Sequence, residues 1–141
     1  MLGIDYGLRR IGLALSDATG TLASPWRLVE RQGSMSSTTN DLVREIQRLI
    51  AEDDGLSAVV LGWPRRLDGS PTELTSEVET LARTLETRVN LPVILQDERL
   101  SSHEADARLA HRERDWRRRK HKLDAAAAAV VLQDYLDHRT R

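Results

Sequence analysis

The order of strand and helix patterns along the chain most constrains its fold. Residues 2–6 and 10–16 are short apolar segments of strand type, joined by a tight turn that contains Gly7, as in a β-hairpin. A second turn leads to a third candidate strand over 21–29, in which Pro25 indicates an edge strand or a bulge. The first 30 residues therefore predict a three-stranded antiparallel meander.

Helical and strand patterns alternate in the rest of the chain. After a polar loop over 32–40, apolar residues recur at helical spacing from 42 to 50. The further predicted elements are a strand over 56–62, a helix begun by the capping-box sequence 70–73, a strand over 91–98, a helix over about 101–111 and an alanine-rich helix over about 122–138. This order predicts an α/β fold with a mixed five-stranded sheet flanked by helices, in a single domain over 1–141.

Composition excludes several classes of protein. The 141 residues include no cysteine, which excludes disulfides, a thiol nucleophile and a thiolate zinc site. No run is long and apolar enough to cross a bilayer, and the N-terminus lacks the pattern of a secretory signal, so we expect a cytoplasmic protein without a membrane partner.

Positive charge is concentrated in one stretch of the chain, although the formal net charge is −1. The basic residues of 111–122, apart from its histidines, are Arg112, Arg114, Arg117, Arg118, Arg119, Lys120 and Lys122, against only two acids. A local positive block on a nearly neutral protein predicts a phosphate-binding footprint. Trp116 lies among these arginines, either as a platform on which a base stacks or as a buried anchor of the loop.

Carboxylates mark the ends of the key elements. Asp5 lies in the first strand, Asp97 and Glu98 end the last strand, and Asp124 starts the last predicted helix. Ligands collect outside the carboxyl ends of parallel strands, where these acids would meet. Close carboxylates repel each other, and a hard divalent cation removes that conflict. Two such ions support phosphodiester hydrolysis without a cysteine, serine or histidine nucleophile.

Each acid also has an ordinary structural interpretation. Asp124 at a helix start is commonly an N-cap, and an acid at a strand end is usually a turn residue or a salt-bridge partner. Asp5 is harder to explain in this way, because a lone charge among Leu2, Ile4 and Tyr6 is costly to bury. The metal hypothesis therefore depends on the three acids converging.

Four blocks of the sequence, at 3–17, 62–70, 97–102 and 122–137, resemble the YqgF/RuvX family in order and spacing. The resemblance implies a ribonuclease H-like fold and a bacterial, cytoplasmic nuclease. Members are described as Holliday junction resolvases and as nucleases that mature the 5′ end of pre-16S ribosomal RNA. The family's catalytic acids would fall on Asp5, Glu98 and Asp124, which would bind Mg²⁺ or Mn²⁺.

The sequence offers one candidate for a fourth metal ligand, His121. Resolvases of the wider superfamily tend to use four, but Ala127 stands three residues after Asp124. His121 stands three residues before it and would share its helix face if the last helix begins early enough. The alternative is that His121 is a solvated member of the basic stretch.

Four further arginines are candidates for phosphate contacts. Arg10 follows the first turn, and it would otherwise pair with Asp17 or another acid. Arg65 and Arg66 precede a predicted helix N-terminus, where phosphates bind, or are simply solvated. Arg99 would stabilise charge on the scissile phosphate or orient Glu98.

Three functions compete at this point. A metal-dependent nuclease acting on precursor ribosomal RNA is favoured, and a four-way DNA junction is the rival substrate. A junction has two-fold symmetry and calls for a homodimer, for which the sequence shows no obvious dimer helix. A non-catalytic RNA-binding assembly factor would gain nothing from three acids, because added negative charge does not help a protein to bind phosphates. A nucleotide-binding protein related to sugar kinases would need two such domains, and the chain lacks a phosphate-loop motif.

Overall fold

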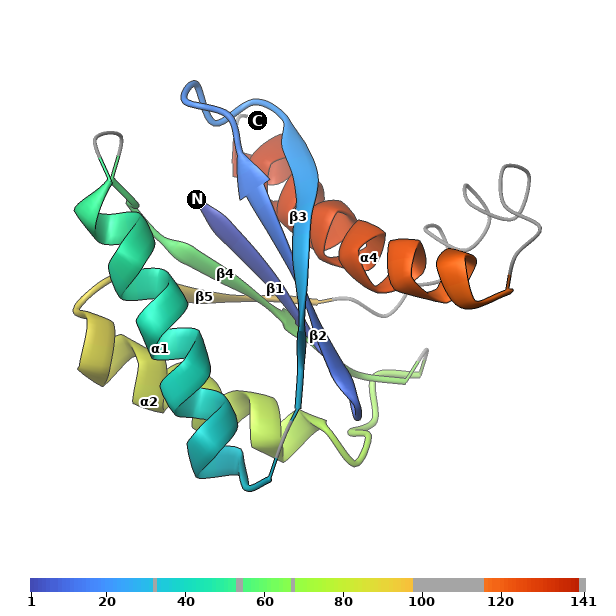
Figure 1. The fold of residues 1–141 in the computed structure, drawn as a ribbon. Helices are drawn as coiled ribbons and strands as arrows, with labels where there is room; N and C mark the ends of the chain where they lie inside the picture. The colour runs from blue at the N-terminus through green and yellow to red at the C-terminus, as the bar shows by residue number, and fades with distance from the viewer. Residues whose placement is uncertain (32, 53–54, 67, 98–115, 140–141) are drawn as a thin grey trace.

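The computed structural model describes residues 1–31, 33–52, 55–66, 68–97 and 116–139, without the side chains of 116–124 (Figure 1). Its strands are β1 (Leu2–Tyr6), β2 (Arg10–Ser16), β3 (Ala23–Glu30), β4 (Val59–Trp63) and β5 (Val93–Asp97). Its helices are α1 (Met35–Ala51), α2 (Thr75–Val89) and α4 (Trp116–Arg139). The helix predicted over 101–111 lies outside the described residues.

The five strands form one mixed sheet in the order β3-β2-β1-β4-β5. β1 and β3 each pair antiparallel with β2, whereas β4 pairs parallel with both β1 and β5. Pro25 lies in the edge strand β3, opposite a register shift between Leu13 and Ala14, because proline cannot donate to an inner ladder. The predicted α/β sheet with an N-terminal meander is confirmed.

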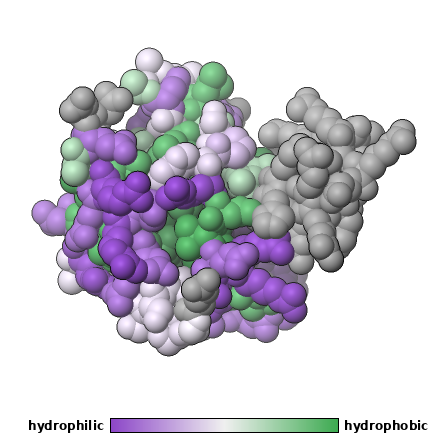
Figure 2. Space-filling view, in the orientation of Figure 1, coloured by the Kyte–Doolittle hydropathy of each residue, from purple (hydrophilic) through white to green (hydrophobic). Residues whose placement is uncertain are grey.

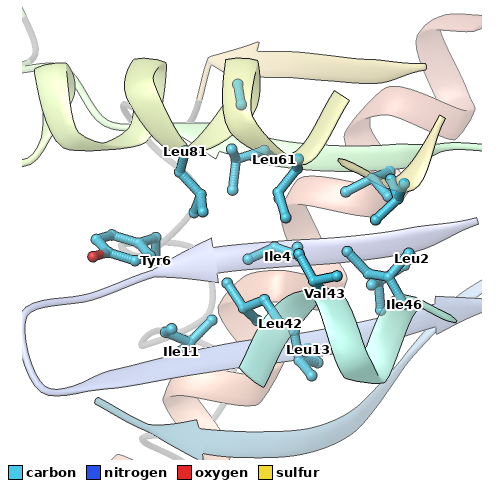
Figure 3. Packing of buried hydrophobic residues seen from close by; sticks show 14 of the residues in the cluster. Leu2, Ile4, Tyr6, Ile11, Leu13, Leu42, Val43, Ile46, Leu61 and Leu81 are labelled. Atoms are coloured by element: carbon cyan, nitrogen blue, oxygen red, sulfur yellow. The ribbon is translucent and has the colours of Figure 1, made fainter. Parts of the chain in front are cut away.

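Alternate residues of the strands form two cores. Leu2, Ile4 and Tyr6 of β1 pack with apolar side chains of α1 and α2, such as Ile46 and Leu81 (Figure 3). Helix α4 covers the opposite face of the sheet (Figure 1). There the buried residues are Ala14, Val60, Ala128, Val131, Leu132 and Leu136. Hydrophilic residues dominate the outer surface over α1 (Figure 2).

Helix α1 begins earlier than the sequence predicted. It starts at Met35, so residues 35–40 of the expected polar loop are helical. The Ser34 hydroxyl caps the helix by accepting a hydrogen bond from the backbone N–H of Ser37 at 3.2 Å. Thr38 and Thr39 are buried, and each hydroxyl donates to the carbonyl four residues earlier, which satisfies these polar groups inside the core.

The predicted starts of the other two helices were also wrong. Helix α2 begins at Thr75 and has no side-chain cap, so 70–73 is not a capping box. The Thr75 hydroxyl instead donates to the Pro64 carbonyl at 2.6 Å and ties the helix start to the end of β4. Helix α4 begins at Trp116, six residues before the predicted start. None of the described helices is long and apolar enough to cross a membrane.

Candidate active site at the carboxyl edge of the sheet

Asp5 occupies the position that the sequence singled out. It is the penultimate residue of β1 and points to the face covered by α4, since Ile4 and Tyr6 point to the other core. Its side chain is partly exposed, whereas the adjoining residues of β1 are buried. Asp5 is therefore half-buried rather than sealed in the core.

The positions beside Asp5 in the two neighbouring strands are both glycines. Gly12 of β2 is its direct partner across the antiparallel pair. On the other side Ile4 pairs with Leu61, so the same parallel register continued by one residue brings Gly62 beside Asp5. Neither neighbour in the sheet has a side chain, so neither competes with a ligand for the space next to the acid.

Helix α4 approaches β1 closely two residues before Asp5. A Cβ atom added to Gly3 would lie 2.7 Å from Leu132 Cβ and 3.0 Å from the Ala128 carbonyl oxygen. Helix α4 runs in the direction opposite to β1. Arg139 near its C-terminus donates to the Gly20 carbonyl in the β2–β3 turn, which lies at the end of the sheet away from Asp5. The helix turn before Ala128, which contains backbone position 124, therefore lies toward Asp5.

The structure excludes the N-cap interpretation of Asp124. Residue 124 is the ninth residue of α4, so Asp124 is not the N-cap of that helix. Positions 121 and 124 both belong to α4, which meets the condition set for His121 as a fourth ligand. The side chains of His121 and Asp124 lie outside the described residues, as do those of Arg117, Arg118, Arg119, Lys120 and Lys122. All of Glu98 and Arg99 also lies outside them.

Asp97 ends β5 at the same edge of the sheet and has a structural role. Its Oδ2 atom lies 3.9 Å from Nη1 of Arg65, which follows the neighbouring strand β4. This contact fits the salt-bridge interpretation of Asp97. Among the side chains that the structure describes, no three acids or histidines form a cluster that could hold a metal ion.

The loop after β4 holds Arg65 in place. Its Nε and Nη2 atoms donate to the Gly69 carbonyl at 2.9 Å and 2.6 Å, and its guanidinium stacks over the Trp63 ring at 4.4 Å. Arg65 is therefore held by protein contacts and still 29% exposed, whereas Arg66 belongs to the exposed surface. The solvated interpretation fits Arg66 and is wrong for Arg65.

Arg10 lies on the same face of the sheet as Asp5. It stands two residues from Gly12 in β2, so both point toward α4. Its cross-strand partner is Glu30. Asp17 follows the opposite end of β2, so the alternative that Arg10 pairs with Asp17 is wrong, whereas pairing with another acid stays an alternative.

A cluster around Arg31 was not anticipated from the sequence. The Arg31 guanidinium lies over the Tyr6 ring at 4.6 Å, donates to the Gly7 carbonyl at 3.1 Å and pairs with Glu77 of α2 at 3.3 Å. Burial raises the pKa of the Tyr6 phenol, and the nearby Arg31 charge opposes part of that shift. Sequence spacing carries no signal for this cluster, because its members meet only through the folded sheet.

Comparison with known proteins places the chain among nucleases. The RuvX family model, described as "Holliday junction resolvase", matches residues 1–138. A protein of Maridesulfovibrio salexigens named "Putative pre-16S rRNA nuclease" is 39% identical over 136 residues, which is 96% of each chain. A protein of Shouchella clausii with the same name is 34% identical, over 99% of this chain and 95% of its own.

Solved structures show the same fold. RuvC of Thermus thermophilus in complex with a Holliday junction substrate superposes with a TM-score of 0.57 over 99% of this chain and 94% of its own. The free Thermus thermophilus RuvC gives 0.56. Sequence identity is 14% and 15%, so these likenesses concern the fold alone, and they confirm the predicted ribonuclease H-like architecture.

Proposed function

We propose that this chain, which belongs to the RuvX family, is a nuclease that hydrolyses phosphodiester bonds in nucleic acid. The observation that carries the proposal is the position of Asp5. A half-buried aspartate lies between two glycine positions at the carboxyl edge of a ribonuclease H-like sheet. A fold alone does not determine a function, but a carboxylate at this place is suited to phosphodiester chemistry.

Asp5, Glu98 and Asp124 would together hold Mg²⁺ or Mn²⁺, as one ion or a pair. The donor chemistry fits, because carboxylate oxygens are the ligands that such cations prefer. The course of α4 supports the inclusion of Asp124, since Ala128 packs on Gly3 and position 124 lies one turn nearer Asp5. When bound, the metal supplies an activated water and neutralises charge on the phosphate. His121 is proposed as a further ligand from the same helix.

The basic residues would bind the sugar-phosphate backbone. Arg10 begins β2 and Arg65 follows β4, the two strands that neighbour β1 and Asp5. Arg65 is already oriented by Gly69 and Trp63. The proposed footprint continues through Arg66, Arg99, Arg117, Arg118, Arg119, Lys120 and Lys122. The first turns of α4 carry the last five, so the binding stretch and Asp124 belong to one helix.

Precursor 16S ribosomal RNA is the favoured substrate, on the strength of the names of the sequence relatives. A four-way DNA junction is the second candidate, because the family description and the RuvC complex both refer to one. A junction would require two copies of the chain related by two-fold symmetry. An RNA-binding assembly factor without turnover is the contrasting class.

The decisive experiment compares both substrates under the same conditions. End-labelled pre-16S-type RNA and a four-way DNA junction are incubated with Mg²⁺ or Mn²⁺ and with wild type, Asp5→Asn or Asp41→Asn. Asp41→Asn is the matched control, because Asp41 lies on α1 and pairs with Arg44. We expect metal-dependent cleavage that only Asp5→Asn abolishes, and the better substrate identifies the role. Binding without any cleavage would contradict the nuclease and favour the assembly factor.

A further inference from the structure

The turn between β1 and β2 presents an apolar side chain beside the candidate site. Leu8 follows Asp5 by three residues and its side chain is 59% exposed. Arg9 beside it is also exposed. Exposure of one leucine is common on protein surfaces, and Leu22 at the opposite edge of the sheet is 62% exposed. The position of its turn, directly after the strand that carries Asp5, distinguishes Leu8 from Leu22.

Backbone contacts hold the turn in one conformation. The Gly7 N–H donates to the Arg10 carbonyl at 3.0 Å, and the Arg9 carbonyl accepts from the Arg31 N–H at 2.9 Å. A Cβ atom on Gly7 would lie 2.6 Å from the Arg10 carbonyl oxygen, so only glycine fits this close approach. The turn is therefore ordered before any ligand binds.

Arg31 anchors this turn to the rest of the fold. Its guanidinium donates to the Gly7 carbonyl at 3.1 Å while it contacts Tyr6 in β1 and Glu77 in α2. Only 19% of the Arg31 side chain is exposed, so the anchor lies under the turn. Through Arg31, β1 and α2 thus support a turn whose exposed side chains are Leu8 and Arg9.

We propose that Leu8 is a substrate contact, which packs against the face of an unstacked base next to the scissile phosphodiester. This inference rests on the proposed nuclease function and identifies the form of nucleic acid that the site accepts. Apolar side chains inserted beside bases stabilise unstacked steps, and every base offers an apolar face. The rigid turn lowers the entropic cost of such a contact. The site therefore selects strands with an unpaired or distorted base at the cleavage point.

The test uses RNA oligonucleotides that carry 2-aminopurine at successive positions, because unstacking of this base increases its fluorescence. Binding is measured without divalent metal, so that it is independent of cleavage, and cleavage is measured separately with Mn²⁺. The variants are Leu8→Ala and Leu8→Met, with Leu22→Ala as the matched control. Thermal unfolding of each variant checks that the fold is retained.

We expect one position to brighten on binding to wild type, Leu8→Met and Leu22→Ala, but not to Leu8→Ala. Leu8→Ala should also bind about tenfold more weakly, as expected when two to three apolar carbons are no longer buried against a base. Arg31→Gln should reduce the same signal although Leu8 is present, because the guanidinium no longer holds the Gly7 carbonyl. Equal fluorescence and affinity for Leu8→Ala and wild type would overturn the inference. A Leu8-dependent signal without any cleavage would instead overturn the proposed nuclease and leave the base contact standing.

Discussion

At the scale of single residues, Asp17 shows how a turn depends on one carboxylate. Its oxygens accept hydrogen bonds from the N–H groups of Thr21 at 2.8 Å and Leu22 at 3.2 Å and from the Thr19 hydroxyl at 2.9 Å. These donors, the two backbone N–H groups above all, lower the pKa of Asp17 below its ordinary value. Asp17 thus shapes the β2–β3 turn.

This lowered pKa predicts a pH dependence of stability. The contribution of Asp17 should be fully present above the unfolded pKa of about 3.9, and it should be lost as the pH falls through the lower folded pKa. Asp17→Asn should therefore be less stable than wild type in urea unfolding at pH 7, and the difference should shrink at pH 3 and below. Glu52→Gln is the control, because it also removes one surface carboxylate but lies outside the β2–β3 turn. An equal pH trend for both variants would contradict the prediction.

Residue-scale prediction from the sequence was uneven, for a physical reason. Asp5 was recognisable because a charge in an apolar strand violates the local pattern. Arg31 was not recognisable, because its contacts with Gly7 and Glu77 join residues 24 and 46 positions apart. Such contacts exist only after the sheet and α2 have assembled. The proposed partners of Asp5 in metal binding, Glu98 and Asp124, stay predictions.

At the scale of elements, the distance between α4 and the sheet depends on small residues. Ala128 is fully buried and its carbonyl faces Gly3 across the contact. Ala128→Leu should lower the free energy of unfolding by about 1–3 kcal/mol, because a close-packed interface must open to admit the added atoms. It should also reduce cleavage, since position 124 moves away from Asp5. Urea unfolding and a cleavage assay measure the two effects.

Ala51→Leu is the control for that substitution. It makes the same change at the exposed last residue of α1, so we expect little loss of stability and unchanged cleavage. If Ala128→Leu were as stable and active as Ala51→Leu, the close approach of α4 would not govern the site.

Strands were predicted more accurately than helix starts. The bounds of β1 and β2 matched because alternation and a glycine turn are local signals. The start of α2 depends on the Thr75 hydroxyl reaching the Pro64 carbonyl, and the buried threonines of α1 bond to their own helix. The polar residues before 42 looked like loop and those at 70–73 looked like a helix start, because the partners of polar groups inside the fold are not visible in the local sequence.

At the scale of the whole molecule, the distribution of charge matters more than its sum. The formal net charge is −1, so attraction to a polyanion must come from local basic stretches. The triple variant Arg117→Gln/Arg118→Gln/Arg119→Gln should weaken RNA binding and flatten its salt dependence. The slope of log K against log salt becomes shallower by about 0.7 for each phosphate of a single strand that the protein no longer neutralises.

A second triple variant with the same net charge as the first separates the effect of the basic stretch from the effect of total charge. Arg44→Gln/Arg48→Gln/Arg83→Gln removes three exposed arginines from α1 and α2. We expect its salt dependence to match wild type in a fluorescence anisotropy titration. Equal slopes for the two triple variants would show that the stretch at the start of α4 has no special part in binding.

The continuity of α4 from Trp116 to Arg139 also bears on how this chain tolerates changes of length. Each residue of a helix advances it by about 1.5 Å and turns it by about 100°. Packing on Gly3 fixes the later turns, so one residue inserted between 119 and 124 would swing the basic turns around the axis relative to Asp124. Insertions and deletions accepted during evolution should therefore avoid this stretch and collect in the loops.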